Sequence, residues 1–357
     1  MNILGVGTIF QGGVGMRSFE KALEQGWTKP SDMDAKWAAG GKHPVYQVNI
    51  DAAPDRAVLK KIRRADRLSK MAVLAAAEAV KDSAVADLQH KSVGIILATA
   101  FGAHVTTFGF LDTILDFGEA AVSPTIFSNS VHNAAASYIS TALDIKGPTL
   151  TVTQFRFSFA AALQLAATWL ELSRCDYVLA GAVDQLGDVL EYVASRKLAV
   201  AADGKIRPFS FHPTAHVPGE GAAFVLLGNE QTGHAYCTVP SIAVNDDAEQ
   251  ATTPDVIIID ADGMQPDESI YASQVSPASI VTAYSPLFGS MMTGGMFNTA
   301  VAALMLKRQQ YYAAPVADNP RGLKIMDRSG PASIQAIDCL CCDCSGTKAA
   351  IRLAALR

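Results

Sequence analysis

Short apolar runs alternate with longer amphipathic segments along the first two thirds of the chain. Runs such as SVGIILATA have the length and the β-branched content of buried strands, whereas residues 64–83 and 159–173 carry apolar side chains at helical spacing. Strands that alternate with helices form right-handed βαβ units, which predicts a mostly parallel sheet covered on both faces. The strands predicted in this part are 3–9, 93–98, 150–154, 177–182 and 222–227.

The same rhythm begins again near Gly233. We therefore expect an α/β protein with two similar halves, residues 1–230 and 231–357. The segment RPFSFHPTAHVPGEG at 207–221 is polar and contains Pro, Gly and His, so we expect a loop on the side of a functional site. In the second half the pattern predicts a helix at 294–308 and strands at 236–244, 256–260, 333–341 and 348–356.

Composition and charge exclude several classes of function. Half of the 357 residues are hydrophobic and 18% are charged, which is typical of a globular chain with a large core. The net charge of −5 argues against nucleic acid as a partner, because phosphate binding needs concentrated Lys and Arg. No apolar run reaches the length of a membrane span, and the N-terminal residues lack a basic leader. We expect a cytoplasmic protein with reduced cysteines.

Two motifs that suggest a bound metal or cofactor are weak. Cys339, Cys341, Cys342 and Cys344 form a C-x-C-C-x-C cluster, but no second ligand pair lies at the spacing of a zinc site. We expect these cysteines to be small residues of a strand and its turn, and we expect no metal. The glycines of GVGTIFQGGVG resemble a nucleotide loop, yet Phe10 stands where the third glycine belongs. No cofactor is expected.

The segment GPTLTVTQFRFSFAAALQLAATWLE, residues 147–171, carries the most informative chemistry. It turns from a β-run into a helix of small residues, and such a turn places one side chain at a helix N-terminus, where a thiolate or alkoxide is favoured. Arg156 occupies the turn instead. An arginine cannot attack a carbonyl, and a cation at this end of a helix is disfavoured unless an acid neutralises it. A carboxylate is therefore expected nearby.

Five further segments occur in the order found in β-ketoacyl synthases: SVGIILATA, GPTLTV, CDYVLAGAVDQL, RPFSFHPTAHVPGEGAAFVLL and CSGTKAAIRL. The whole chain resembles these thiolase-fold condensing enzymes. The resemblance implies two similar βαβαβαββ halves that form a five-layered αβαβα core. The run SPTIFSNSVHNAAASYIS, residues 123–140, resembles the chain-length-factor branch, in particular the partner subunits of aryl-polyene-type ketosynthases.

The resemblance also implies where the catalytic groups would lie. Condensing members use a cysteine nucleophile and two histidines, with a lysine near the second histidine. The cysteine position falls on Arg156, the first histidine on Asp262, the second on Ser290 and the lysine on Ser285. The gating phenylalanine of the C-terminal run falls on Cys344. With no acid, base or acyl carrier at these positions, we expect no condensation by this chain alone.

The same positions predict a buried ion pair. Arg156 and Asp262 face one another around the family's active site, so we expect a charge-assisted pair between them. The alternative is that Arg156 turns to solvent or across a dimer interface. A decarboxylating variant of the family uses glutamine in place of cysteine, and Gln154 lies two residues too early for that role.

The resemblance implies a role for an inactive copy. Thiolase-fold proteins dimerise through the strand before the nucleophile, here 150–154, and in chain-length-factor complexes the inactive subunit lines the far end of the partner's acyl tunnel. His132, Asn133 and Gln154 are interface candidates. The tunnel candidates recur at helical spacing, which an ordinary buried helix face explains equally well. They are Phe108, Phe110, Leu111, Ile114 and Leu115.

A basic segment, KKIRRADRLSKMA at 60–72, stands out in an acidic chain. The resemblance implies that an acidic acyl carrier protein docks on this helix, with Lys60, Arg63 and Arg64 as candidate contacts. A solvated helix start is the simpler explanation of the same charges.

Three functions are therefore in competition. The first is a non-catalytic ketosynthase-like subunit that pairs with an active ketosynthase and shapes its acyl tunnel, with aryl polyenes as the expected product class. The second is a divergent acyltransferase or thioester hydrolase that uses Ser158, Ser290, His212 or His216. The third is a homodimeric scaffold.

Overall fold

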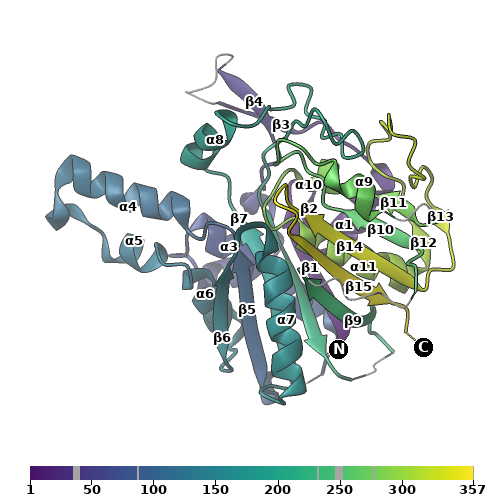
Figure 1. Cartoon of the computed structure of the whole chain (residues 1–357). Helices are drawn as coiled ribbons and strands as arrows, with labels where there is room; N and C mark the ends of the chain where they lie inside the picture. The colour runs from purple at the N-terminus through teal and green to yellow at the C-terminus, as the bar shows by residue number, and fades with distance from the viewer. Residues whose placement is uncertain (35–40, 87, 231–232, 246–251, 276–277, 357) are drawn as a thin grey trace.

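The computed structural model describes residues 1–34, 41–86, 88–230, 233–245, 252–275 and 278–356 (Figure 1). The first half of the chain supplies five strands to the central sheet, in the order β6-β5-β7-β8-β1. Their residues are buried except in β6, which lies at the edge. The strands are β1 (Asn2–Phe10), β5 (Val93–Thr99), β6 (Thr149–Thr153), β7 (Tyr177–Asp184) and β8 (Gly221–Gly228).

The second half repeats this topology in the order β11-β10-β14-β15-β9. In both halves the strands counted along the chain lie in the order third, second, fourth, fifth, first, so the two halves are similar as predicted. The two sets join where Asn2 of β1 pairs with Thr238 of β9. The boundary at residue 230 remains a prediction from the sequence. The strands are β9 (Cys237–Val244), β10 (Val256–Ile259), β11 (Ile280–Thr282), β14 (Ala336–Cys342) and β15 (Lys348–Ala354).

The prediction of a mostly parallel sheet is wrong. β5 runs parallel to β6 and β7, and β10 runs parallel to β11 and β14. In each half the fifth strand along the chain runs against the other four. β8 is antiparallel to its neighbours β7 and β1, and β15 is antiparallel to its neighbours β14 and β9. The apolar pattern marks which segments are strands but carries no information on their direction. The sheet is therefore mixed.

Helices form three layers around the two sets of strands (Figure 1). α7 (Ser158–Glu171) and α11 (Gly295–Arg308) lie between the sets and contact strands of both. α3 (Arg67–Ser83) and α6 (Ala134–Leu143) cover the outer face of the first set. The short α9 (Ile270–Gln274) and loop residues such as Phe211 cover the outer face of the second. These are the five layers that the resemblance implied.

The glycines of the N-terminal strand serve packing. A Cβ atom on Gly5 would lie 2.3 Å from the carbonyl oxygen of Ala79, and one on Gly7 would lie 2.1 Å from that of Ala75. Both carbonyls belong to α3, so the GVG sequence lets this helix contact β1 directly. The close approach accounts for these glycines without a nucleotide.

The remaining elements are short. The predicted helix 64–83 begins later, at Arg67, because the side chain of Asp66 caps α3; α2 is a separate helix that ends at Lys61. The other helices are α1 (Gly15–Gln25), α2 (Arg56–Lys61), α4 (His104–Phe117), α5 (Pro124–Asn129), α8 (Asp188–Ser195) and α10 (Ser285–Phe288), with one-turn helices at Ile50–Ala52, Leu88–His90, Glu119–Ala121 and Phe155–Phe157. The other strands are β2 (Gly13–Val14), β3 (Ser31–Asp34), β4 (Lys42–Val45), β12 (Gln310–Tyr311) and β13 (Gly330–Pro331).

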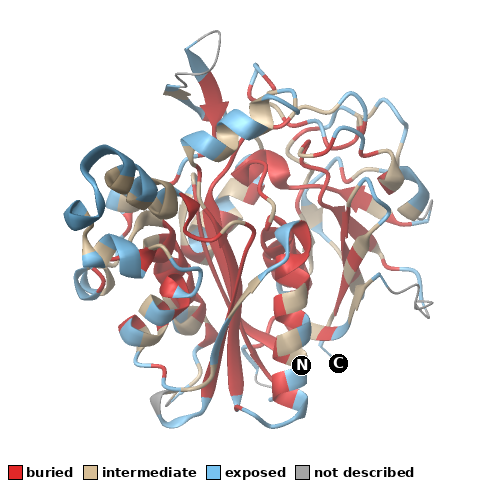
Figure 2. Cartoon of the chain, turned by 60° about the vertical axis from the view of Figure 1, so that its left-hand side comes forward, coloured by how far each residue is buried: buried red, intermediate tan, exposed pale blue. Residues whose placement is uncertain are grey.

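Residues 104–133, which we call the arm, project from the body and contain α4 and α5 (Figure 1). The arm is mostly exposed or half-buried in the single chain (Figure 2), and His104 is the only buried residue of α4. Leu115 is 81% exposed and Phe117 is 75% exposed. The interpretation of α4 as an ordinary buried helix face is therefore wrong.

The segment 207–221 also differs from expectation. Phe209, Phe211 and Val217 are buried, so this segment is part of the core despite its polar composition. Its polar residues are largely used internally; the buried carboxylate of Glu220, for example, accepts hydrogen bonds from the peptide N–H groups of Val48 and Leu186. Within the described ranges, no helix is long and apolar enough to cross a membrane.

Candidate functional site

The turn between β6 and α7 directs Arg156 into the interior. Arg156 is 4% exposed, so the alternative in which it turns to solvent is wrong. The buried hydroxyl of Ser158 fixes the turn, because it accepts a hydrogen bond from the peptide N–H of Gln154 at 2.7 Å and lies 2.7 Å from the carbonyl oxygen of Phe155. Phe155 adopts a φ of 46°, in the left-handed region, which reverses the chain ahead of Arg156.

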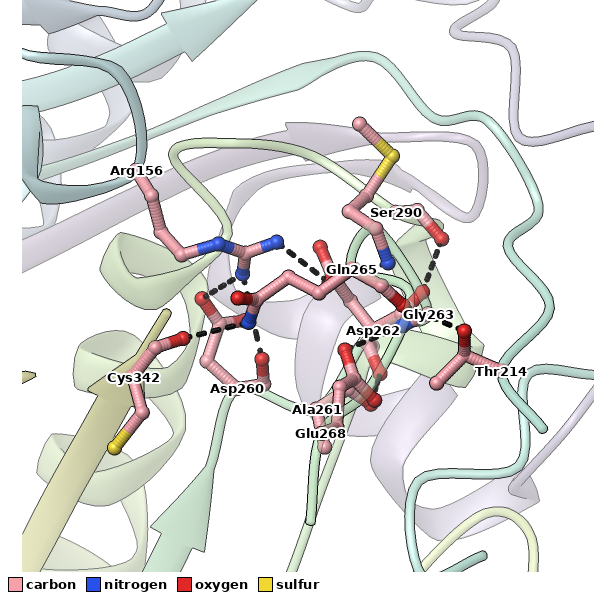
Figure 3. A network of polar contacts seen from close by, with 12 residues as sticks. Arg156, Thr214, Asp260, Ala261, Asp262, Gly263, Gln265, Glu268, Ser290 and Cys342 are labelled. Carbon is pink, nitrogen blue, oxygen red and sulfur yellow. Dashed lines mark hydrogen bonds and ion pairs between the residues drawn. The ribbon is translucent and has the colours of Figure 1, made fainter. Parts of the chain in front are cut away.

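Two carboxylates hold the guanidinium group of Arg156 (Figure 3). Nη2 donates to Oδ1 of Asp262 at 2.9 Å, which confirms the predicted pair. Nη1 donates to Oδ2 of Asp260 at 3.2 Å. Asp260 follows β10 directly, and its ion pair was not predicted from the sequence, because the family's histidine position indicates only Asp262. Two acids at positions i and i+2 after a buried strand were the available signal.

The site contains more acid than base. Burial works against the charge of Arg156, but the combined attraction of Asp262, Asp260 and other neighbouring acidic groups outweighs it, and the pKa of Arg156 lies above its ordinary value. Burial, followed by the repulsion of Asp262, raises the pKa of both Asp260 and Glu268. Oδ2 of Asp262 has no hydrogen-bond partner among the described residues. One cation therefore faces three buried carboxyl groups, and the raised pKa values of Asp260 and Glu268 favour protons on these two groups, which offset the excess negative charge.

Hydrogen bonds fix the loop that carries these acids. The peptide N–H of Gly263 donates to Glu268 at 2.9 Å, and the hydroxyl of Tyr271 donates to the carbonyl oxygen of Asp260 at 2.9 Å. Gln265 Nε2 donates to the carbonyl oxygen of Cys342 in β14 at 2.7 Å (Figure 3). The acids that hold Arg156 are thus tied to the second set of strands.

The serines predicted to stand at the histidine and lysine positions of the family carry hydroxyls that are hydrogen-bonded to the backbone. Ser290 Oγ donates to the carbonyl oxygen of Asp262 at 2.5 Å and accepts from the peptide N–H of Val217 at 3.1 Å. Ser285 is buried and its Oγ lies 3.3 Å from the carbonyl oxygen of Ala261. Neither side chain offers a proton acceptor of the basicity that general-base catalysis requires.

The groups considered for a relocated activity are not arranged as a catalytic pair. His212 is exposed and its Nδ1 lies 3.4 Å from the carbonyl oxygen of Pro266. His216 is buried, its Nδ1 lies 2.8 Å from the carbonyl oxygen of Ala199, and burial lowers its pKa. In the part of the chain that the structure describes, no hydrogen bond joins either imidazole to Ser158 or Ser290.

The cysteine cluster lies in and after β14. Cys339, Cys341 and Cys342 are buried in the strand, and Cys344 is exposed in the turn that follows. Burial raises the pKa of Cys341 well above its ordinary value, so its thiol stays protonated. Over the described residues, no group of three or more His, Cys, Asp or Glu is arranged to hold a metal ion.

The structure places the interface candidates along one side of the molecule. The side chain of Phe155 is 63% exposed, and its ring centroid lies 5.7 Å from that of Phe101, which precedes the arm. His132 is exposed and packs against Gly102, where a Cβ atom would lie 2.4 Å from the imidazole. Gln154, which directly follows the edge strand β6, and Asn133, the last residue of the arm, are also exposed. In the arm, Phe110 packs on Phe127 at 5.6 Å, Leu111 and Leu115 are exposed, and Phe108 and Ile114 are half-buried.

The basic segment adjoins the base of the arm. Lys60, Arg63 and Arg64 are exposed at the end of α2 and in the turn before α3. The carbonyl oxygen of Arg64 accepts a hydrogen bond from Nδ2 of Asn129 in α5 at 2.8 Å. The charges and the arm therefore form neighbouring surfaces.

Comparison with known proteins identifies the family. The description "Beta-ketoacyl synthase, N-terminal domain" matches residues 1–232, well over half of the chain. The chain belongs to the β-ketoacyl synthase family. Nodulation protein E of Rhizobium meliloti (strain 1021) is 25% identical over 224 residues, which cover 60% of this chain and 56% of that relative. This chain spans about half to two thirds of the length of the curated proteins that it matches.

Solved structures confirm the thiolase-like ketosynthase fold. The ishigamide ketosynthase/chain length factor superposes with a TM-score of 0.81 at 16% identity and covers all of this chain and 99% of its own. A type II polyketide synthase acyl-carrier protein in complex with its ketosynthase gives a TM-score of 0.79 at 15% identity, with 99% of each chain covered. The protein is therefore ketosynthase-like over its whole length in fold.

Proposed function

We propose that this chain is a non-condensing ketosynthase-like subunit that pairs with an active β-ketoacyl synthase and shapes its acyl tunnel. The observation that carries the proposal is the guanidinium group of Arg156 at the nucleophile position, clamped by Asp260 and Asp262. A guanidinium group accepts no acyl group, and the two serines at the histidine and lysine positions supply no base.

The exposed apolar side chains of the arm support the pairing. Leu111, Leu115, Phe117 and Phe127 leave apolar surface in contact with water in the single chain. Contiguous exposed apolar surface of this kind marks an interaction site. The edge strand β6 lies on the same side and offers peptide groups to a second sheet. Phe108, Phe110 and Ile114, half-buried in the arm, are the proposed side chains that limit the length of the acyl chain.

The product class rests on the sequence. The segment 123–140 resembles the partners of aryl-polyene-type ketosynthases, and we extend the proposal to polyketide or fatty-acid-type synthesis with an aryl polyene as the product. The acyl carrier protein would meet the basic segment near α2.

The experiment combines the purified chain with intact ketosynthases, beginning with any encoded beside it. Alone, the chain should form no acyl adduct with acyl-carrier and malonyl-carrier thioesters, as read by intact mass. With its partner it should elute as a heterodimer that extends chains. Chain extension or a stable acyl adduct on the isolated chain would contradict the proposal and favour the acyltransferase. A homodimer indifferent to every ketosynthase would favour the scaffold.

Charge reversal at the basic segment tests carrier docking. The triple variant Lys60→Glu, Arg63→Glu, Arg64→Glu should weaken the affinity of the heterodimer for its acyl carrier protein at least tenfold at low salt, because exposed charges steer an acidic partner. Surface plasmon resonance at two ionic strengths measures the effect. The matched control is Lys21→Glu with Lys29→Glu and Lys91→Glu, three exposed lysines elsewhere on the chain. Equal affinity of the two variants would remove the docking role.

A further inference from the structure

A cavity of about 340 Å³ lies between α8 and the loops around Ser290. Met264, Met291 and Met292 form one wall, and Leu190 and Ala194 of α8 form the opposite wall. Methionine side chains are flexible and polarizable, so they adapt to the shape of an apolar guest. The volume lies within the range of small-molecule sites, roughly 300–1,000 Å³.

The floor of this cavity contains polar groups that are already satisfied. Asp184 accepts hydrogen bonds from Thr99 and Ala100 on one oxygen and from the N–H and hydroxyl of Thr293 on the other. Ser290 is engaged by Asp262 and Val217. These groups have little capacity left for a ligand, so the interior favours hydrocarbon.

Two polar side chains at the α8 side, those of Glu191 and Lys197, remain available to a ligand. Glu191 is half-buried, and none of the described residues forms a hydrogen bond with its carboxyl group. Burial, together with the neighbouring charge of Asp188, raises the pKa of Glu191 to about 8, so its carboxyl group carries a proton at neutral pH and can donate a hydrogen bond. Lys197 lines the same cavity and is exposed at its rim.

We propose that this cavity binds a compact apolar carboxylic acid, with its carboxylate held by Lys197 and Glu191 and its hydrocarbon body against the methionines. A lysine ammonium group and a protonated carboxyl group are both donors, and a carboxylate is the acceptor that matches them. An amine would meet Lys197 as a like charge. A neutral alcohol would leave the ammonium group without a counter-charge.

The proposal goes beyond the pairing function, which requires no ligand within this chain itself. α8 has no buried residue, and Leu190, Glu191 and Ala194 of this helix line the cavity. A bound hydrocarbon would bury this face and stabilise the helix. Binding should therefore slow amide hydrogen exchange in α8.

The test titrates octanoate and octanol into the purified chain and follows calorimetric heat and hydrogen exchange. Octanoate should bind at least fivefold more tightly than octanol and protect α8. Lys197→Gln should weaken octanoate roughly tenfold, the effect of losing one charge-assisted hydrogen bond, and leave octanol unchanged. Met292→Trp should fill the cavity and weaken both ligands. The matched control is Lys21→Gln, an exposed lysine far along the sequence from the cavity residues.

Each outcome decides the proposal. Octanoate that fails to bind, binds Lys197→Gln as tightly as the wild type, or binds Met292→Trp unchanged would overturn it. Heat without protection of α8 would place octanoate elsewhere and would also overturn it. Heterodimer formation is measured without octanoate, so failure of the ligand proposal is distinguishable from failure of the pairing proposal.

Discussion

At the scale of single residues, Arg156 is a buried cation held between two carboxylates. Removing one partner of a buried ion pair is far more costly than breaking an exposed pair, because the remaining charge stays unpaired in the interior. Asp260 and Asp262 depend on one guanidinium group, and Glu268 adds a third carboxyl group close by. The stability of the fold in this region is therefore coupled to Arg156.

Arg156→Met tests this coupling. We expect the free energy of unfolding to fall by about 3–5 kcal/mol at pH 8, because two buried carboxylates lose their cation. The pKa values of Asp260 and Glu268 are already raised in the folded state, so the folded chain binds more protons than the unfolded chain as pH falls. The loss should consequently be smaller at pH 5 than at pH 8. Urea unfolding at both pH values measures it.

Arg207→Met is the matched control. Arg207 pairs with Asp203 and Asp318, but its side chain is 41% exposed, and exposed ion pairs contribute roughly 0–1 kcal/mol. A pH-independent loss of the same size in both variants would show that the acidic cluster does not depend on Arg156.

The sequence predicted this site only in part. The pair between Arg156 and Asp262 follows from positions along the chain. The second partnership, with Asp260, depends on how far the loop after β10 turns toward α7, and short-range patterns contain no such distance. Ser158 is a candidate nucleophile in the sequence. Its buried hydroxyl forms hydrogen bonds with the backbone of Gln154 and Thr99, and only the three-dimensional structure shows them.

At the scale of elements, one side chain links α3 to the arm. Asp66 caps α3 by accepting a hydrogen bond from the peptide N–H of Ser69 at 2.9 Å. Its other oxygen accepts from the hydroxyl of Thr106 in α4 at 2.8 Å. The helix start and the base of the arm therefore share a residue.

Asp66→Ala should lower the free energy of unfolding by about 1 kcal/mol through loss of the cap, and it should speed amide exchange in α4. Thr106→Val is the matched control, because it removes the bond to α4 and leaves the cap in place. It should speed exchange in α4 with a smaller effect on unfolding. Identical exchange of α4 in wild type and both variants would exclude the link.

The arm also shows where sequence periodicity is insufficient. Apolar residues at helical spacing predict a helix, and α4 is one, but the same spacing does not distinguish a face buried in the core from a face that awaits another chain. The start of α3 was predicted too early, at residue 64, although Asp66 is a preferred N-cap residue ahead of an apolar run.

At the scale of the whole molecule, the two edge strands, β11 and β6, differ in whether other backbone covers their outer side. β11 is covered, because the peptide N–H of Val281 donates to Lys324 and its carbonyl accepts from Met326. Within the described ranges, β6 pairs with β5 alone. The peptide N–H of Ile95 donates to Pro148, so in the parallel ladder Thr149, Thr151 and Thr153 direct their N–H groups outward.

Thr151→Pro should abolish pairing with the ketosynthase while the chain stays folded, since an edge strand tolerates the loss of an outward N–H group. Thr151→Val keeps that group and should pair normally. Size-exclusion chromatography with circular dichroism measures both properties. A heterodimer formed by a folded Thr151→Pro variant would show that β6 is not part of the interface.

The direction of the strands was the hardest property to predict. The alternation of strands and helices and the repeat of the rhythm after Gly233 gave the fold class and the two similar halves. The direction of β8 and β15 depends on connections whose path the apolar pattern does not record.

The junction between the halves has a consequence for biosynthesis. All nine residues of β1 are buried between β8 and β9, and Asn2 pairs with both Gly228 and Thr238. β1 therefore has neither of these neighbours until the ribosome has also synthesised β8 and β9, which lie far along the chain. Until then the apolar residues of β1 are exposed to solvent, and a chaperone that binds apolar segments would protect them from aggregation.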